Sequence, residues 1–145
     1  MTKYCTDSYL GYNGFTDNKT ELDLEDDAAY VNWGPAWRMP SKEQFAELIN
    51  SNYTTTTWTT QNGVKGLLIT SKMEGYTGNS VFLPAAGSRI NSSLYEAGSY
   101  GDYWSRSLHG YPYGACDLYF YSGLIDTGFS GRDYGRSVRP VRVSE

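Results

Sequence analysis

The spacing of apolar residues predicts a helix in the first half of the chain. Ser41 can cap this helix, and Gln44, three residues later, can close a capping box. Phe45, Leu48 and Ile49 follow at the spacing of one helical face, so they predict a stripe that packs against a core. We therefore expect an amphipathic helix that begins just after Ser41.

A second, shorter helix is predicted over residues 26–31, beside an acidic cluster. The cluster contains Asp23, Glu25, Asp26 and Asp27, and negative charge stabilises the first turn of a helix. A calcium loop is the alternative, but the ligand spacing of an EF-hand is absent from the sequence. Before this helix, residues 1–20 are rich in turn-forming residues, which predict a loop with a short strand.

The pattern then changes to that of strands. Residues 53–60 are rich in Thr and Trp, residues 61–63 form a turn signal, and residues 64–70 predict the partner strand of a hairpin. Another strand is predicted over residues 80–83, ending at Pro84. Helices followed by short, mostly antiparallel strands predict an α+β fold with two short helices and long loops.

One strand in the last third of the chain alternates clearly between its two faces. Leu118 and Phe120 fall on one face, and Asp117, Tyr119 and Tyr121 fall on the other. We expect the first face to pack in the core and the second to be exposed. Exposed tyrosines are costly unless a partner covers them, so the second face predicts a binding surface.

The C-terminal region predicts a closing strand and contains several arginines. The strand spans residues 138–143, and Pro140 limits it to an edge of a sheet or to the start of a strand. The arginines could bind an anionic ligand, but we favour their pairing with the acidic cluster at residues 23–27. They are Arg132, Arg136, Arg139 and Arg142.

Composition points to binding. The chain has 145 residues, which fits one domain. Aromatic residues make up 16 % of it, including 14 Tyr, while charged residues make up only 19 %. Tyr, Ser, Gly and Asn are the residues enriched in antibody combining sites. The net charge of −4 argues against nucleic-acid binding, and no apolar run approaches the ~20 residues of a membrane span.

Candidate catalytic residues are scarce. The single histidine, His109, has no Asp or Ser at a spacing that would orient it as a general base, so we expect it in a surface loop. Cys5 and Cys116 have no nucleophile, zinc or disulfide signature. We therefore expect no enzyme activity, metal site or cofactor.

Residues 105–136 have an unusual composition. Lys, Glu, Gln, Met and Trp are all absent from them, although each occurs elsewhere in the chain. These five are the amino acids that no codon ending in C encodes. The pattern indicates either a codon bias of this stretch, in which codons end in C, or an ordinary drift toward Tyr and Gly in a loop.

Six short motifs are spread along most of the chain, from residue 26 to residue 141. They are DDAA at 26–29, WG at 33–34, WRMPS at 37–41, FLPAAG at 82–87, GDYWS at 101–105 and SVRPV at 137–141. Their order resembles that of the Fibrobacter succinogenes major paralogous domain, a family of gut Bacteroidetes and their phages. The resemblance implies a single domain, residues 1–145, with a C-type lectin-like fold.

Some members of this family are variable proteins of diversity-generating retroelements. There, error-prone copying of template adenines rewrites a C-terminal region, and Asn codons ending in C are favoured sites. The resemblance implies a variable region at about 103–141. Its implied framework is Trp104, Ser105, Ala115, Leu118, Phe120, Arg132 and Gly135. Its implied ligand-binding residues are Arg106, His109, Tyr111, Pro112, Tyr113, Asp117, Tyr119, Tyr121, Leu124, Asp126, Thr127, Phe129, Asp133 and Tyr134.

The sequence departs from the family in one respect and from calcium-dependent lectins in another. Family members usually carry an N-terminal strand before the segment that begins here, so we expect that strand to be missing or supplied by a partner. The closing strand would then have an open edge, which favours homo-oligomers. The Glu-Pro-Asn, Gln-Pro-Asp and Trp-Asn-Asp motifs of sugar-binding lectins are absent, so calcium-mediated glycan recognition is not expected.

Three functions follow from the resemblance. The favoured one is a display domain, on a cell surface or a phage particle, that binds a protein or glycan through a diversified surface. The alternative is a carbohydrate-binding adhesin of fixed specificity. The third is an enzyme, because formylglycine-generating enzymes share the fold; it would require a catalytic Cys5 or Cys116.

Overall fold

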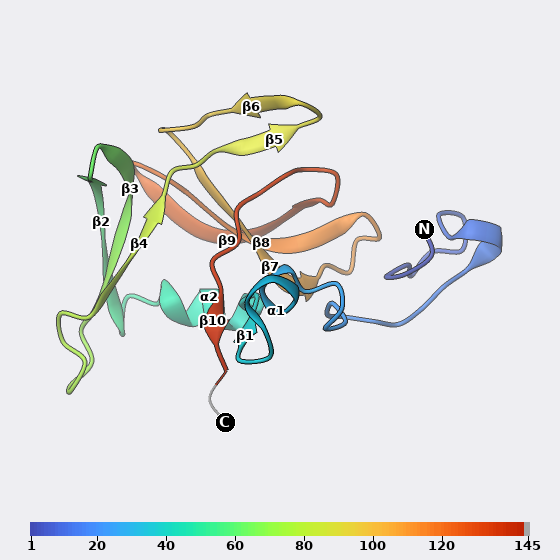
Figure 1. Cartoon of the computed structure of the whole chain (residues 1–145), viewed down its shortest axis with the longest axis horizontal. Coiled ribbons are helices and arrows are strands. Elements are labelled where there is room, and N and C mark those ends of the chain that lie inside the picture. The colour runs from blue at the N-terminus through green and yellow to red at the C-terminus, as the bar shows by residue number, and fades with distance from the viewer. Residues whose placement is uncertain (144–145) are drawn as a thin grey trace.

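The computed structural model describes residues 1–143 and has the predicted α+β composition (Figure 1). Its helices are short and its strands outnumber them. In chain order the elements are the 3₁₀ turn η1 (Tyr12–Gly14), α1 (Ala28–Trp33), β1 (Trp37–Arg38), α2 (Lys42–Leu48), β2 (Thr54–Gln61), β3 (Val64–Ser71), β4 (Ser80–Pro84), β5 (Ser88–Ile90), β6 (Ser93–Tyr95), β7 (Gly101–Leu108), β8 (Gly114–Tyr121), β9 (Leu124–Gly131) and β10 (Val141–Arg142).

The strands form small antiparallel sheets. Two sheets have three strands, in the orders β2-β3-β4 and β7-β8-β9. Two more have two strands, β5-β6 and β1-β10. Figure 1 shows the β5-β6 hairpin on one side of the β7-β8-β9 sheet and α2 on the other. The central sheet is therefore enclosed between a hairpin and a helix.

Helix α2 begins as predicted. The Ser41 hydroxyl accepts a hydrogen bond from the Gln44 backbone N–H at 3.2 Å, and Gln44 Oε1 accepts one from the Ser41 N–H at 2.9 Å. These two bonds complete the capping box. Phe45 is buried, and Leu48 and Ile49 pack partly buried against the core, so the predicted apolar stripe is confirmed.

Helix α1 begins at Ala28, two residues later than predicted, because Asp27 caps it. Asp27 Oδ1 accepts hydrogen bonds from the N–H groups of Ala29 at 2.8 Å and Tyr30 at 3.0 Å. Its two oxygens also accept from Met39 N–H at 3.1 and 3.0 Å. Asp27, 1 % exposed, thus ties the helix to the segment after β1.

The predicted hairpin is confirmed as β2-β3. Asn62 and Gly63 both have positive φ, as a two-residue turn of this kind requires. Strand pairing runs without interruption from Thr54–Ser71 to Gln61–Val64. The predicted strand at 80–83 is also present, as β4, which pairs with the edge of β3 that β2 leaves free.

One core joins α2 to both three-stranded sheets. Phe45 of α2 lies in one buried cluster with residues of both sheets. The other members are Leu67, Ile69, Leu83, Ala85, Tyr103, Leu118 and Phe120. The Tyr103 hydroxyl donates to the Pro84 carbonyl at 2.8 Å, which links the two sheets directly. The core therefore fixes the position of β7-β8-β9.

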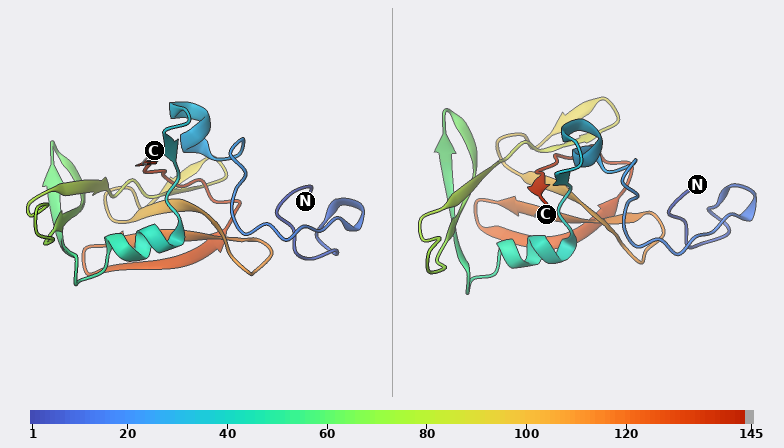
Figure 2. Two further views of the ribbon diagram at one scale, coloured as in Figure 1. Left: turned by 90° about the horizontal axis from the view of Figure 1, so that it is seen from below. Right: turned by 60° about the horizontal axis from the view of Figure 1, so that its bottom comes forward.

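The N-terminal segment departs from the prediction. Within residues 1–20 the described structure has only the turn η1 and no strand. The segment extends from one end of the molecule (Figures 1 and 2). Arg132 holds it by donating to the Tyr4 carbonyl at 2.7 Å, beside the fully buried Cys5.

The predicted closing strand is shorter than expected. Only Val141 and Arg142 pair, with Arg38 and Trp37 of β1. Pro140 has no N–H to donate to a neighbouring strand, so pairing begins after it.

Candidate functional site

Strand register places part of the predicted site on one face of the β7-β8-β9 sheet. Residues directly opposite in an antiparallel pair share a face. Asp117 lies opposite Gly128, Tyr119 opposite Asp126, and Tyr121 opposite Leu124. We call this the outer face, because Leu118 and Phe120 on the other face pack in the core.

The same register places two predicted residues on the core-facing side. Thr127 lies opposite Leu118, and Phe129 lies opposite Cys116. Phe129 is nevertheless 52 % exposed, because it lies near the end of the sheet. The predicted binding residues therefore do not form a single face.

A groove of about 750 Å³ lies over the outer face. The sheet forms its floor, and the β5-β6 hairpin with the segment near residue 135 forms its walls. We call it the central groove; its lining residues are Ser88, Ile90, Tyr95, Glu96, Tyr100, Asp102, Asp117, Tyr119, Gly128, Phe129, Ser130, Gly131, Tyr134 and Arg136.

The floor of the central groove contains a buried charge cluster. Arg136 Nη1 forms an ion pair with Asp117 and lies 3.4 Å from Asp102 Oδ1. Arg136 Nη2 donates to the Ser130 hydroxyl at 2.7 Å. The guanidinium also lies over the Trp104 ring, 4.8 Å from its centroid. Burial raises the pKa of Asp102 and so favours its protonated form, while Arg136 opposes this shift.

Two predictions are corrected by this cluster. Asp117 faces the predicted side of its strand, but it is 2 % exposed rather than displayed, because it pairs with Arg136. Arg136 itself was expected to pair with the acidic cluster at residues 23–27. The reason for both errors is the same: the pairing brings together groups 19 residues apart in the sequence.

A second group of predicted residues lies in and beside the β7–β8 loop. His109 and Phe129 are stacked, with ring centroids 3.7 Å apart and an angle of 3°. Tyr111 lies 5.6 Å from Tyr113 and 6.4 Å from Phe129. Tyr111, Tyr113 and Phe129 are each about half exposed, and Pro112 between the tyrosines is partly buried. We call these rings the loop aromatic patch.

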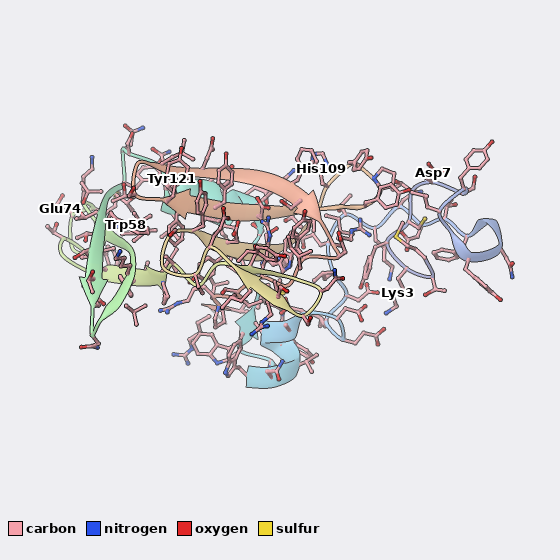
Figure 3. The ribbon with its side chains drawn as sticks, turned by 90° about the horizontal axis from the view of Figure 1, so that it is seen from above. Lys3, Asp7, Trp58, Glu74, His109 and Tyr121 are labelled. Atoms are coloured by element: carbon pink, nitrogen blue, oxygen red, sulfur yellow. The ribbon has the colours of Figure 1, made fainter. Side chains whose placement is uncertain are left out.

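The opposite end of the sheet carries a third pair of rings. Tyr121 packs against Tyr100, with centroids 5.1 Å apart. Figure 3 shows Tyr121 and His109 at opposite ends of the sheet. Leu124, Asp126 and Asp133 are exposed, as predicted for displayed residues.

Arg106 makes structural contacts away from the central groove. Its Nε pairs with Glu21 at 3.2 Å, and its Nη1 donates to the Met39 carbonyl at 2.9 Å and to Gln44 Oε1 at 3.1 Å. The side chain therefore joins β7 to the start of α2 and to the segment before α1. These contacts favour a scaffold role for Arg106.

Several groove residues were absent from the sequence prediction. Tyr95, Glu96 and Tyr100 come from or follow the β5-β6 hairpin, outside residues 105–136, and Asp102 comes from β7. The signal that could have found them is the density of tyrosines near residues 95–103. For Arg136 the sequence suggested an anionic ligand or the acidic cluster at residues 23–27, and neither Asp102 nor Asp117 was among the expected partners.

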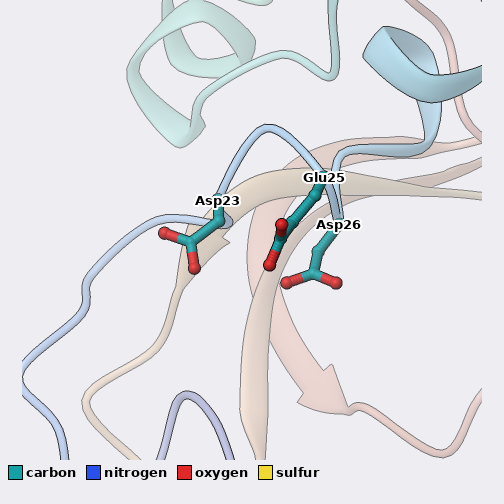
Figure 4. A group of neighbouring side chains, drawn as sticks. All are labelled: Asp23, Glu25 and Asp26. Atoms are coloured by element: carbon teal, nitrogen blue, oxygen red, sulfur yellow. The ribbon is translucent and has the colours of Figure 1, made fainter.

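The acidic cluster pairs with lysines instead of arginines. Asp23, Glu25 and Asp26 place one carboxylate oxygen each within 4.8 Å of one another (Figure 4). Lys3 contacts all three, and Lys19 pairs with Asp23. Hydrogen bonds from Lys19 and Lys3 lower the pKa of Asp23 and Asp26, respectively. The lysine ammonium groups thus supply the positive charge that the cluster needs.

Arg132 and the cysteines have structural surroundings. Arg132 Nε donates to the Gly114 carbonyl at 3.0 Å, and burial lowers the pKa of its guanidinium. In the described part of the chain, Cys5 and Cys116 are both buried free thiols. Burial raises the pKa of Cys116, which reduces its reactive thiolate form.

Comparison of the chain with protein-family models, curated proteins and solved structures finds no match. Within residues 1–143, none of the helices has the length and apolar character needed to cross a membrane.

Proposed function

We propose that this domain binds ligands through the central groove and the loop aromatic patch, on a C-type lectin-like scaffold whose C-terminal surface is diversified by a retroelement. The observation that carries the proposal is the alternation along β8. Leu118 and Phe120 are fully buried in the core, while Tyr119 and Tyr121 on the same strand lie on the outer face. Such a strand can change its binding residues without changing its packing residues.

The aromatic side chains supply the affinity of this surface. A few aromatic anchors usually dominate the binding energy of an interface. Tyr119 and Tyr134 line the central groove, while Tyr111, Tyr113 and Phe129 expose about half of their surface in the loop aromatic patch. A tyrosine adds a hydroxyl that can bond to polar groups at low entropic cost.

The DNA beside the coding region tests the proposal. We expect a reverse transcriptase gene and a near-copy of the segment that encodes residues 103–141. Mismatches between the two copies should be confined to template adenines and should fall in codons for surface positions such as Tyr119 and Asp126. Absence of a second copy, or mismatches at all four bases, would contradict diversification.

An adhesin of fixed carbohydrate specificity is the second candidate. Tyrosine rings beside buried carboxylates, as at Tyr119 and Asp117, resemble the surfaces that stack on sugar rings and bond to their hydroxyls. If the domain is such an adhesin, close relatives should keep the same residues at 106–134. Binding to a defined glycan on an array, together with the absence of a template copy, would favour it. A surface location for the domain, on a cell or a phage particle, is part of both proposals.

The formation of homo-oligomers by this chain remains a prediction. The β1-β10 sheet has only two strands, so each strand has one edge without a partner within residues 1–143. Sedimentation of the isolated chain would show whether a second copy pairs there.

A further inference from the structure

We propose that the floor of the central groove is a subsite for a cationic side chain, arginine in preference to lysine, presented by a protein target. The inference rests on the proposed binding function of the groove and names the chemistry that the groove would select. It follows from one buried carboxylate oxygen, the charges around it and the rings beside it.

Asp117 is buried but only half satisfied. It is 2 % exposed, and its Oδ2 pairs with Arg136. Its Oδ1 is also buried and accepts no hydrogen bond from any group of residues 1–143. A buried acceptor without a donor is destabilising, so a ligand that supplies an N–H donor there gains more than it would at the surface.

Gly128 lies beside this oxygen. A Cβ at Gly128 would lie 3.2 Å from Asp117 Oδ1 and 3.1 Å from the Tyr119 ring. Both Gly128 and Asp117 line the central groove. Both distances are shorter than ordinary van der Waals contact, so the bare backbone of Gly128 lies close against the unpaired oxygen, and any larger residue would push against Asp117 and the Tyr119 ring.

The charges at the groove favour a cation. Its lining includes the carboxylates of Glu96, Asp102 and Asp117 but only one basic side chain, Arg136. Two of the Arg136 nitrogens are already engaged with the two aspartates and Ser130. Asp117 neutralises the guanidinium, and the remaining negative charge, which comes from Glu96 and from Asp102 when it is ionised, attracts a second cation.

The rings at the groove favour arginine over lysine. Tyr95, Tyr119 and Tyr134 line it, and a guanidinium can stack on such rings while its N–H groups point at a carboxylate. Arg136 already does this over Trp104. In addition, Arg136 Nε is buried and has no hydrogen-bond acceptor within residues 1–143, so a main-chain carbonyl of the target could accept from it.

N-acetyl-argininamide is the probe that tests the subsite. It carries the guanidinium and a peptide carbonyl, and its citrulline analogue has the same shape without the charge. In an NMR titration of the whole chain, we expect the arginine compound to shift the amide signals of Gly128 and Tyr119. We expect the citrulline analogue to bind at least tenfold more weakly and the lysine analogue to fall between them.

Gly128→Ala tests the place of binding. The added methyl group should weaken binding of the probe about tenfold, because it crowds Asp117 Oδ1 and the Tyr119 ring at the groove floor. The matched control is Gly123→Ala in the β8–β9 turn, where the nearest atom to a Cβ is 3.7 Å away; it should leave binding unchanged. If Gly128→Ala impairs folding, Glu96→Gln at the exposed rim replaces it and should weaken binding several-fold at low salt, whereas Glu74→Gln on the distant β3–β4 connection should not.

Three results would overturn the subsite. Equal binding of the citrulline analogue would indicate an amide site without charge selection. Binding of methyl glycosides at Gly128 and Tyr119 without binding of the arginine probe would assign the groove to glycans. Retention of full arginine affinity in both Gly128→Ala and Glu96→Gln would place the cation elsewhere. None of these results bears on the template copy in the DNA, so the proposed diversification is tested separately.

Discussion

Asp27 shows how much structure one side chain can organise. It caps α1 and also accepts the Met39 N–H, so three backbone donors depend on one buried carboxylate. We expect Asp27→Ala to lower the free energy of unfolding by about 2–4 kcal/mol, because it removes a helix cap and leaves a buried N–H unpaired.

Urea denaturation at pH 7 measures this effect. Asp126→Ala is the matched control, because Asp126 is exposed on β9; its change should stay within about 0.5 kcal/mol. Asp27→Asn should lower the free energy of unfolding less than Asp27→Ala, since the amide oxygen of Asn can still accept hydrogen bonds from the backbone N–H groups. Equal denaturation midpoints for wild type and Asp27→Ala would show that the cap is dispensable.

Tyr103 is a core residue at which alkaline pH should act. Burial raises the pKa of Tyr103 from 10.0 to about 12. Between these values the unfolded chain loses the phenolic proton and the folded chain keeps it, so stability falls as pH rises through this range. A shift of about two units corresponds to about 2–3 kcal/mol lost by pH 12.

Tyr103→Phe isolates this contribution. At pH 8 we expect the variant to be about 1 kcal/mol less stable than wild type, because the Pro84 carbonyl loses its donor. As pH rises from 10 toward 12, the variant should lose less stability than wild type, so the two plots of unfolding free energy against pH should converge and then cross. A constant difference between them across this range would assign the alkaline loss to other groups.

At the scale of elements, the packing of β7 against β8 depends on Gly101. A Cβ there would lie 2.0 Å from Cζ of Phe120, which is fully buried and has no room to move. We expect Gly101→Ala to cost at least about 1–3 kcal/mol through overpacking, measured by thermal or urea unfolding.

Gly123→Ala is again the matched control, since Gly123 lies in a turn and a Cβ there would make only an ordinary contact with the Tyr121 ring, at 3.7 Å. Its stability should change by less than about 0.5 kcal/mol. If Gly101→Ala were as stable as Gly123→Ala, then the central sheet would tolerate a shift that the core geometry does not predict.

At the scale of the whole molecule, stability and binding should be separable. Tyr119→Ala and Tyr121→Ala remove rings from the outer face and should change the free energy of unfolding by about 1 kcal/mol or less. Leu118→Ala, on the same strand but fully buried, should cost about 2–5 kcal/mol. Urea titration of the three variants tests this division. Unfolding of the domain by either tyrosine substitution would refute the proposed display of these residues.

The sequence by itself determined the local elements. The Ser41–Gln44 capping box, the apolar stripe headed by Phe45 and the Asn62–Gly63 turn were all predictable, because each depends on hydrogen bonds or spacings within a few residues. The alternation of Leu118 and Phe120 with Tyr119 and Tyr121 was equally readable, since successive side chains of a strand point to opposite faces. The α+β composition followed from these elements.

Only the tertiary structure decided how these elements form a site. The central groove exists because the β5-β6 hairpin and Arg136 reach the outer face from distant parts of the chain. The same contacts bury Asp117, while the end of the sheet exposes Phe129 on the other side. Local patterns specify which face a side chain takes, whereas burial and charge pairing depend on what packs against that face.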